Sequence, residues 1–355
     1  MQILHVVGAR PNFMKVAPVH RALATRSGVK QMLVHTGQHY DVNMSDVFFQ
    51  QLSIPSPDVN LGVGSGSHGK QTAEIMIGFE NLAQERRPDL VLVYGDVNST
   101  VAAALVCAKL GIRIGHVEAG LRSGDRTMPE EINRLVTDQL ADMLFTPSDD
   151  GDKNLAKEGV PKEKIFLVGN VMIDTLVRLL PSAQEASRDG LPDKYILVTL
   201  HRPSNVDDPS SLRSLLAALS VISQSVPVVF PVHPRTRQRI KDLVMNLPAS
   251  DRLVLLDPRP YIEFLALQHH SAAVVTDSGG IQEETTFLGI PCITVRENTE
   301  RPVTVTQGTN VLVGHDLNAL NREVQNVLTG RTKPYRIPPL WDGKASERIA
   351  DIIAK

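Results

Sequence analysis

Short apolar runs alternate with stretches of helical periodicity along the whole chain. Apolar runs typical of buried strands occupy residues 3–7, 31–35, 90–94, 113–117, 165–168, 195–200, 226–232, 252–256, 272–276, 291–295 and 310–313. Helical patterns lie between most of them, at residues 14–25, 70–84, 100–109, 130–142, 209–223, 236–245 and 317–328. This alternation predicts parallel sheets with helices on both faces.

The number of predicted strands is too large for one comfortable open sheet. The length of 355 residues also exceeds the usual size of one domain. We therefore predict an α/β fold with two doubly wound, Rossmann-like domains, residues 1–168 and 169–343, with the boundary near Gly169-Asn170. A short amphipathic helix, Ser346–Ala354, could close either domain.

Composition excludes several classes of partner. The formal net charge is -2 and aromatic residues make up 4% of the chain, so nucleic acid and anionic membranes are not predicted partners. No apolar run is long enough to cross a bilayer, and the N-terminus reads as a strand and not a signal peptide. The two cysteines, Cys107 and Cys292, are predicted to be buried free thiols. We expect a cytoplasmic protein.

In open parallel sheets, ligands bind beyond the carboxyl ends of the strands. In the first half, Arg10 and Lys15 follow the run 3–7 at a strand-to-helix turn, where a pair of cations suits a diphosphate. Solvated surface cations are the alternative for these two residues. Asp96 follows the run 90–94, where it could also be a plain N-cap.

Two further carboxylates belong to the same predicted edge. His116 and Glu118 lie two residues apart on a predicted strand and are expected to share a face. Glu130 opens a predicted helix, where a carboxylate also suits the dipole. Carboxylates gathered at one edge raise one another's pKa and can form general acid/base pairs.

The second half contributes a cationic and polar set at the ends of its strands. His201 and Arg202 follow one predicted strand, and His233 follows the next. The stretch TDSGGIQEE, residues 276–284, predicts a strand, a tight turn and a helix N-terminus, which is an anion site. Arg301 follows the last of these strands and by itself would be a surface residue.

Two other patterns carry less weight. Residues 62–67, GVGSGS, imitate a dinucleotide-binding fingerprint, but the last position is Ser67 and no good strand precedes it. The eleven histidines lack the spacing of metal ligands, so no tightly bound metal is predicted.

The motifs GARPNFMK, GQHYD, YGDVNST, GHVEAGLRS, MPEEINR, HRPSN, PVHPR, TDSGGIQEE, RENTERP and GTNVLVG occur in this order and cover nearly the whole chain. Together they resemble the non-hydrolysing UDP-N-acetylglucosamine 2-epimerase family. The resemblance implies a glycosyltransferase-B type fold with an active site between two domains. It also implies that the C-terminal helix, residues 344–355, packs back on the first domain.

The family inverts carbon 2 of UDP-N-acetylglucosamine and so supplies precursors of cell-surface polysaccharides. The resemblance implies elimination of UDP to 2-acetamidoglucal followed by re-addition, which needs acid/base groups but no metal and no cofactor. A homodimer is expected. Carried over by position, the catalytic residues are Asp96, Glu118, Glu130 and His201. The UDP contacts are Arg10, Lys15, Ser278, Gly279, Gly280, Glu284 and Arg301. In this assignment Glu284 accepts from the ribose hydroxyls, and Glu283 is structural.

Some positions depart from the family pattern. Ala9, Asn12 and Phe13 differ from the common GTRPEAIK form of the first motif, a variation that also resembles epimerases of modified UDP sugars such as diacetamido-glucuronates. Gln38, Arg202 and His233 match contacts of an activating second substrate molecule, but Asp41 stands where a second Gln would be.

Three other functions remain open from the sequence. A hydrolysing epimerase would release N-acetylmannosamine and UDP from the same site. A retaining glycosyltransferase shares the fold, and a non-catalytic sensor would need only the UDP residues. Neither of the last two requires Asp96, Glu118 and Glu130 together.

Overall fold

The structure is a computed structural model that describes residues 1–38, 51–187, 190–232, 236–240 and 251–355. The chain divides into two compact units. The first consists of Met1–Arg178 together with Pro339–Lys355, and the second of Leu179–Pro338. The division falls inside one helix, Val171–Glu185, whereas the predicted boundary near Gly169-Asn170 precedes that helix.

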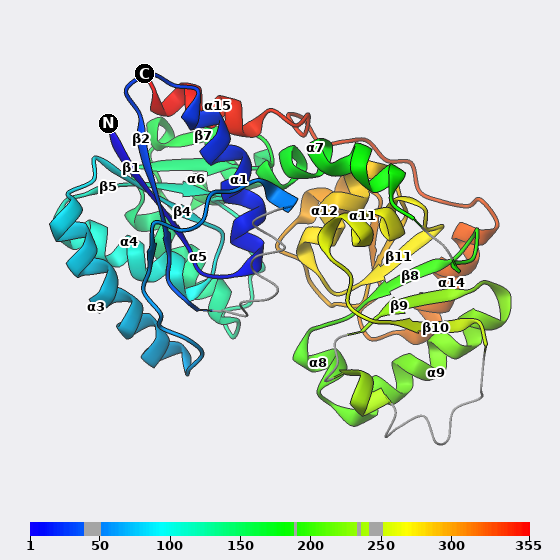
Figure 1. Cartoon of the computed structure of the whole chain (residues 1–355). Coiled ribbons are helices and arrows are strands. Elements are labelled where there is room, and N and C mark those ends of the chain that lie inside the picture. Colours follow the sequence, from blue (N-terminus) through cyan, green and yellow to red (C-terminus); the bar gives the residue numbers. More distant parts are fainter. Residues whose placement is uncertain (39–50, 188–189, 233–235, 241–250) are drawn as a thin grey trace. The chain divides into compact units, whose positions relative to one another are not determined.

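The first unit is built on a seven-stranded sheet (Figure 1). Its strands are β1 (Gln2–Val7), β2 (Lys30–His35), β3 (Val59–Asn60), β4 (Leu90–Tyr94), β5 (Arg113–Val117), β6 (Met143–Thr146) and β7 (Ile165–Leu167). Its helices are α1 (Arg10–Ala24), α3 (His68–Arg86), α4 (Asn98–Leu110), α5 (Pro129–Leu140), α6 (Asp149–Lys157), the 3-10 turn η1 (Lys162–Lys164), the first part of α7 (Val171–Glu185) and α15 (Ala345–Ile353).

The second unit is built on a six-stranded sheet. Its strands are β8 (Ile196–Thr199), β9 (Val228–Pro231), β10 (Leu253–Leu256), β11 (Ala273–Thr276), β12 (Cys292–Thr294) and β13 (Asn310–Leu312). Its helices include α8 (Pro203–Val206), α9 (Pro209–Ser225), α11 (Tyr261–His269), α12 (Gly279–Leu288), α13 (Pro302–Thr306) and α14 (Leu317–Leu328).

Every described strand pair in both sheets is parallel. The strand order is β3-β2-β1-β4-β5-β6-β7 in the first unit and β10-β9-β8-β11-β12-β13 in the second. In each sheet the order reverses once, between β1 and β4 and between β8 and β11. These switch points are where open α/β sheets bind ligands. The observed topology confirms the predicted α/β class with doubly wound, Rossmann-like sheets.

Burial explains why these segments form strands. All five residues of β4 are buried, as expected for a parallel strand covered by helices on both faces. The two sheets have separate apolar cores, one around β4 and α4 and one around β8 and α9. Cys107 and Cys292 are both buried and free, which confirms that prediction.

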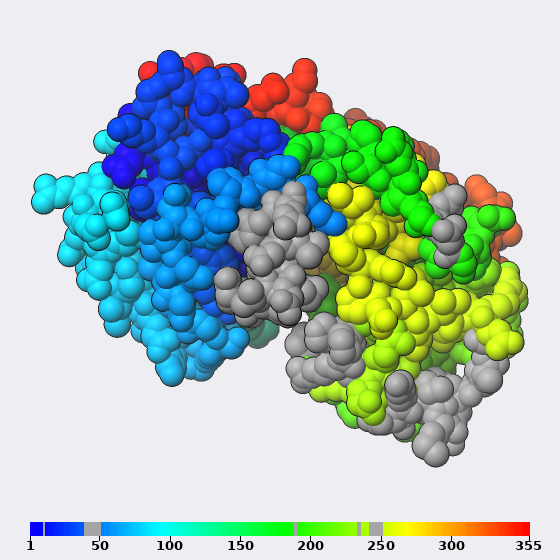
Figure 2. Space-filling model, in the orientation of Figure 1, coloured from blue at the N-terminus to red at the C-terminus, as the bar shows by residue number. Residues whose placement is uncertain are grey.

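The C-terminal segment returns to the first unit. Helix α15 contacts α1, and the red C-terminal segment lies beside the blue α1 region in Figures 1 and 2. Trp341 is buried and donates from its indole Nε1 to the carbonyl oxygen of Pro147 at 2.9 Å. Asp174 in α7 accepts from the N–H groups of Ala345 (3.1 Å) and Ser346 (2.7 Å), and so caps the first turn of α15.

Several elements differ from the sequence prediction. Strands β3 and β6 and helices α6, α7, α8, α11 and α13 were not expected. The predicted helix 236–245 is described only at residues 236–240, which are helical. Within the described residues no helix combines the length and the apolar character needed to cross a membrane.

Asp174→Ala is expected to loosen α15, because two N–H groups of its first turn lose their shared acceptor. Loss of such a cap costs about 1–2 kcal/mol, which corresponds to roughly 5- to 30-fold faster local amide exchange. Hydrogen exchange of residues 345–353 measures this. The matched control is Asp316→Ala, which removes the cap of α14 and should leave α15 unchanged. Unchanged exchange of α15 in Asp174→Ala would show that the cap does not hold the helix.

Candidate active site

The first unit gathers polar side chains on the loops that follow β1, β4 and β5. Lys15 and Glu118 are both buried, and the Lys15 Nζ pairs with the Glu118 Oε2. Gly95, which follows β4, lies against this pair: a Cβ on Gly95 would come within 2.7 Å of the Lys15 Nζ. Gly95 also has a φ of +63°, so both space and backbone favour glycine there. The Lys15–Glu118 pair therefore requires a residue without a side chain at position 95, in the turn after β4.

Glu118 has an unusual backbone conformation for a residue with a side chain. Its φ is 74°, and it lies one residue beyond the end of β5. The alternation of side chains along a strand does not extend to it, so the expectation that His116 and Glu118 share a face is not supported. Backbone strain of this kind is concentrated at functional sites.

Asn12 joins the loop after β1 to the end of β4. Its Oδ1 accepts from the N–H groups of Gly8 (3.0 Å) and Ala9 (3.1 Å), and its Nδ2 donates to the carbonyl oxygen of Tyr94 (2.8 Å). Asn12 is one of the positions that depart from the common family motif, and its side chain has a structural role here. It holds the start of α1, which carries Lys15.

Asp96 is held by a cation that the sequence interpretation did not include. The Arg134 guanidinium donates to Asp96 Oδ2 from Nε (3.0 Å) and Nη2 (2.7 Å). Arg134 also pairs with the buried Glu131 at 2.5 Å. Asp96 and Glu118 thus pair with separate cations, Arg134 and Lys15.

Glu131 organises the loop that follows Glu118. Its carboxylate accepts from the N–H groups of Ser123 (3.0 Å) and Gly124 (2.9 Å). Burial opposes ionisation of Glu131, but these two N–H groups and Arg134 outweigh it and lower the pKa. Glu130, predicted to be catalytic, is half-buried in the first turn of α5, and none of the described residues makes a recorded hydrogen bond or ion pair with its side chain.

In the second unit, Asp277 organises the loop that follows β8. It is fully buried and follows β11, the neighbour of β8. Its carboxylate accepts from the backbone N–H groups of His201 (3.1 Å) and Arg202 (3.0 Å) and from Asn205 Nδ2 (2.9 Å). The His201 Nδ1 lies 2.8 Å from Asp277 Oδ1, and 63% of the His201 side chain is exposed. Burial would raise the pKa of Asp277, but these partners lower it.

The N-terminus of α12 lacks a side-chain cap, and both Arg301 and Glu300 lie against its first residue. Ser278 is the N-cap residue, its side chain makes no capping hydrogen bond, and Gly279 and Gly280 form the first turn. The first N–H groups of a helix have no partner inside the helix. A Cβ on Gly279 would come within 2.3 Å of the Arg301 Nη1, so the guanidinium lies directly against this turn.

Arg301 is fixed by two carboxylates. Its Nε lies 2.9 Å from Glu283 Oε1, and its Nη1 lies 2.5 Å from Glu300 Oε1. Glu300 is shared with Arg296, whose Nη2 lies 2.7 Å away. Glu283 therefore holds the guanidinium at the helix N-terminus. The sequence interpretation had set Glu283 aside as structural without identifying this partner.

Glu284 is buried next to the same turn. The Tyr261 hydroxyl donates to Glu284 Oε1 at 2.8 Å, whereas Glu284 Oε2 has no hydrogen-bond partner of good geometry among the described residues. Burial raises the pKa of Glu284 to about 7, against the smaller opposing effects of Tyr261 and Gln268. A buried carboxylate oxygen without a partner suits a hydroxyl donor from a ligand.

The remaining predicted residues are placed as follows. Arg10 is the first residue of α1, but its side chain is not among the described ones, and His233 and Asp41 lie outside the described residues. Gln38, a candidate activator contact, is buried, and its Oε1 accepts from the Ser99 N–H (3.1 Å) and Oγ (2.8 Å). Arg202 donates from Nε to the carbonyl oxygen of Asp277 at 3.2 Å.

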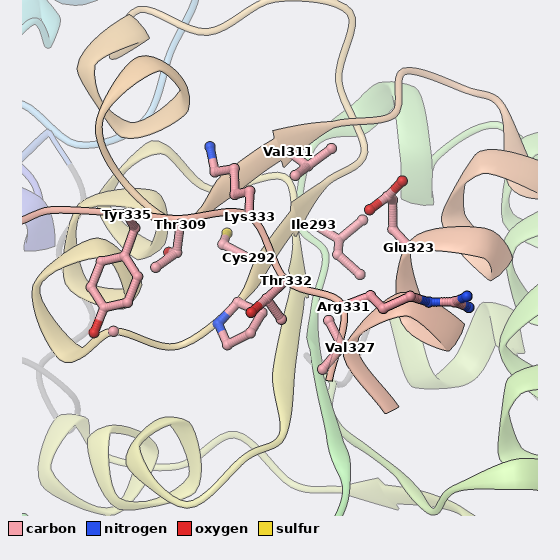
Figure 3. Close-up of a pocket in the computed structure, with 12 residues that line it drawn as sticks. Cys292, Ile293, Thr309, Val311, Glu323, Val327, Arg331, Thr332, Lys333 and Tyr335 are labelled. Atoms are coloured by element: carbon pink, nitrogen blue, oxygen red, sulfur yellow. The ribbon is translucent and has the colours of Figure 1, made fainter. Parts of the chain in front are cut away.

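A pocket in the second unit lies away from these loops (Figure 3). It is lined by residues at the starts of β12 and β13, including Cys292, and by the extended segment that carries Lys333 and Tyr335. The Lys333 Nζ donates to the backbone carbonyls of Val305 (2.6 Å) and Asn310 (2.5 Å). None of the predicted site residues lines it. Among the described residues, no three His, Cys, Asp or Glu side chains form a group that could hold a metal ion.

Fold and site together define a two-unit parallel α/β protein of the glycosyltransferase-B type. One unit has a helix N-terminus without a side-chain cap, and the other has carboxylates that pair with buried cations. A lipopolysaccharide outer core galactosyltransferase, 13% identical with a TM-score of 0.58, shares this fold. A model of the UDP-N-acetylglucosamine 2-epimerase family matches residues 21–354. The chain belongs to this family, which confirms the resemblance seen in its motifs.

Relatives match over their full length. The chain is 43% identical to the UDP-2,3-diacetamido-2,3-dideoxy-D-glucuronate 2-epimerase of Pseudomonas aeruginosa, covering 100% of both chains. It is 39% identical to the UDP-N-acetylglucosamine 2-epimerase of Methanocaldococcus jannaschii, covering 99% of both. A crystal structure of the M. jannaschii enzyme with UDP-GlcNAc and UDP has a TM-score of 0.91 at 40% identity, with 99% of each chain covered.

Glu284→Gln is expected to stabilise the protein at pH 8 and not at pH 5. The folded-state pKa of Glu284 is about 7, above the 4.5 of an exposed glutamate, so burying the charge costs stability above pH 7. This cost shrinks as the pH falls from 7 to 4.5, because the folded state holds the proton first, and it disappears below 4.5, where both states hold it. The difference between the two pH values is on the order of 3 kcal/mol. Thermal unfolding of wild type and variant at both pH values measures it.

Glu283→Gln is the matched control, because it removes the carboxylate that pairs with buried Arg301. We expect it to lower the melting temperature at pH 8, opposite in sign to Glu284→Gln. A melting-temperature difference between Glu284→Gln and wild type that is the same at pH 5 and pH 8 would contradict the buried charge at position 284.

Proposed function

We propose that the protein catalyses the reversible, non-hydrolysing epimerisation of UDP-N-acetylglucosamine at carbon 2 to UDP-N-acetylmannosamine. The observation that carries the proposal is that each unit has its own set of functional groups on the loops at the carboxyl edge of its sheet. One set is a helix N-terminus without a side-chain cap, with a buried, partly unsatisfied carboxylate, which suits a nucleoside diphosphate. The other is a set of buried and half-buried carboxylates with fixed cations, which suits acid/base chemistry.

UDP is bound by the second unit in this proposal. The N–H groups of Gly279 and Gly280 and the Ser278 hydroxyl donate to the diphosphate, and Arg301 adds charge-assisted hydrogen bonds. Glu284 accepts from the ribose hydroxyls, which supply the donors that its Oε2 lacks. Because Glu283 and Glu300 fix the Arg301 guanidinium beforehand, little side-chain entropy is lost on binding.

The sugar chemistry is assigned to Asp96, Glu118 and Glu130 in the first unit and His201 in the second. The proton on carbon 2 has no adjacent carbonyl, so a direct removal would leave an unstabilised carbanion. In the elimination, a carboxylate takes this proton while the electron pair forms the C1=C2 double bond. The C1–O bond breaks at the same time, and UDP leaves with that bond's electrons. Re-addition of UDP with a proton on the opposite face completes the inversion without oxidant or reductant.

The Lys15 ammonium has a defined part in this scheme. It neutralises the charge of the buried Glu118 carboxylate, and it is assigned to the diphosphate by family position. His201, oriented through Nδ1 by Asp277, presents Nε2 as a donor to the departing diphosphate. Arg10 is assigned to the diphosphate by family position alone.

The identity of the sugar is the finer part of the proposal. The identity of 43% to a UDP-diacetamido-glucuronate 2-epimerase makes a modified UDP sugar the second candidate substrate. Hydrolysis to N-acetylmannosamine and UDP is the second candidate outcome. We further propose a cytoplasmic homodimer that supplies polysaccharide precursors, and light scattering tests the dimer. Gln38, Arg202 and His233 are the candidate activator contacts, and substrate-dependence curves test whether activation is retained with Asp41 in place of the second Gln.

Proton NMR of products separates these candidates. Purified protein is incubated with UDP-N-acetylglucosamine and, separately, with the UDP-diacetamido-glucuronate. We expect a UDP-N-acetylmannosamine signal in the first sample and no free sugar. Free N-acetylmannosamine with UDP would instead identify a hydrolysing enzyme, and turnover in the second sample alone would identify the modified sugar as substrate.

Glu118→Gln is expected to lower kcat by about 100-fold or more, because it removes an acid/base group. The Kd for UDP, measured by calorimetry, should change less than about threefold, since five of the seven proposed UDP groups are in the second unit and the substitution leaves Arg10 and Lys15 in place. Glu158→Gln is the control: Glu158 pairs with Arg122 at 2.7 Å beyond the same loop, and kcat should stay near wild type. A Glu118→Gln enzyme with normal kcat would remove Glu118 from the chemistry.

Arg301→Lys is expected to weaken UDP binding by about tenfold, because an ammonium cannot reproduce the bidentate donors of a guanidinium. Lysine is preferred to alanine because Glu283 and Glu300 would otherwise lose their shared cation. Arg296→Lys is the control, since Arg296 also pairs with Glu300 but is not assigned to UDP. Equal Kd values for Arg301→Lys and wild type would exclude Arg301 from the UDP site.

A further inference from the structure

His116 is a fully buried residue of β5 to which the proposed chemistry gives no role. Its ring is bound on both sides: Nε2 lies 2.8 Å from the carbonyl oxygen of Gly95, and Nδ1 lies 2.6 Å from Asp138 Oδ1. A carbonyl and a carboxylate are both acceptors, so each ring nitrogen donates. A histidine with two such short contacts is fixed in position and in ring orientation.

The carbonyl that His116 holds belongs to the turn that carries Asp96. Gly95 adopts a φ of +63°, and its N–H donates to the carbonyl oxygen of Val117 at 3.0 Å. The turn after β4 is therefore fastened to β5 twice, once through the backbone and once through the His116 ring. The same peptide leads directly into Asp96, so its orientation sets the starting point of the Asp96 side chain.

Asp138 in α5 anchors the other side of the ring. Its carboxylate also accepts from the Gly120 N–H at 3.1 Å and pairs with Arg122 Nη1 at 2.7 Å. Burial would raise the pKa of Asp138, but His116 and Arg122 outweigh it and lower the pKa. Gly120 lies two residues after Glu118, with a φ of +81°. The Asp138 carboxylate thus binds two neighbouring parts of the site. One is the loop that carries Glu118, and the other is His116, which holds the turn before Asp96.

We propose that His116 is a positioning residue for the epimerisation: through its Nε2 hydrogen bond to the Gly95 carbonyl, with Asp138 as anchor, it sets the geometry of Asp96 beside the Lys15–Glu118 pair. This inference rests on the proposed function, because it assigns His116 an effect on those carboxylates. His116 itself touches no reacting atom in this scheme. Its effect falls on kcat and not on the binding of UDP, because the His116 ring is hydrogen-bonded to Gly95 and Asp138 and to none of the proposed UDP contacts.

Two substitutions at the same position separate the two hydrogen bonds. His116→Gln places an amide nitrogen near the position of Nε2 and can keep the bond to Gly95. His116→Asn places one near the position of Nδ1, so it can keep the bond to Asp138 but not the one to Gly95. We expect kcat to fall about 100-fold in His116→Asn, the scale of a misplaced catalytic group. In His116→Gln we expect a fall of about tenfold or less.

The Kd for UDP should stay within about threefold of wild type in both variants. His5→Asn is the matched control for loss of a buried, doubly bonded histidine. His5 is fully buried in β1 between the Tyr94 hydroxyl (2.7 Å) and Gln31 Oε1 (2.9 Å), and neither partner is a backbone group of the turn. His5→Asn should lose thermal stability like His116→Asn but keep kcat within about threefold.

The outcomes separate the inference from the function on which it rests. Wild type without epimerase turnover on either UDP sugar overturns the proposed function, and this inference with it. Wild-type turnover with equal kcat in His116→Asn and His116→Gln, or with His5→Asn as impaired as His116→Asn, overturns the positioning role alone. If His116→Asn does not fold, Asp138→Asn replaces it, and an unchanged kcat in that variant overturns the role.

Discussion

Parallel strand pairing is the constraint on which the rest of this structure depends. Because all described strands in a sheet run in the same direction, every loop that leaves a carboxyl end emerges at the same edge. Asp96, Glu118 and Lys15 are brought to one edge in this way, although Lys15 and Glu118 are 103 residues apart in sequence. The second sheet does the same for His201 and the N-terminus of α12.

Charged side chains at these edges are partly removed from water, which costs free energy. Most of them are neutralised by an oppositely charged side chain in a fixed position. Lys15 compensates Glu118, Arg134 compensates Asp96, and two glutamates compensate Arg301. Glu284 is the exception, because burial raises its pKa to about 7 and one of its oxygens has no well-formed hydrogen bond among the described residues. In the proposed function this is a compromise between stability and binding, because the ribose hydroxyls of UDP would supply the missing donors.

The sequence predicted much of the fold, because strand and helix periods are local signals. It missed β6 (Met143–Thr146), a four-residue run directly after a helix, since periodicity over so few residues does not distinguish a strand from a helix end. Residues on the motif loops were also predictable, but their partners were not. Arg134, Tyr261 and Asp277 act through contacts between segments distant in the chain. The helix N-terminus in TDSGGIQEE and the loop of His201 and Arg202 were both predicted, but the hydrogen bonds that join this loop to Asp277 were not.

Elimination and re-addition of UDP require cleavage and re-formation of the C2–H and C1–O bonds. The decisive measurement is proton and deuterium NMR of the UDP-N-acetylmannosamine that wild-type protein forms from UDP-N-acetylglucosamine in heavy water. We expect carbon 2 of the product to carry deuterium, because the proton returned in re-addition comes from a group that exchanges with solvent. A product that retains the original proton at carbon 2 would contradict the elimination and re-addition assigned to these carboxylates.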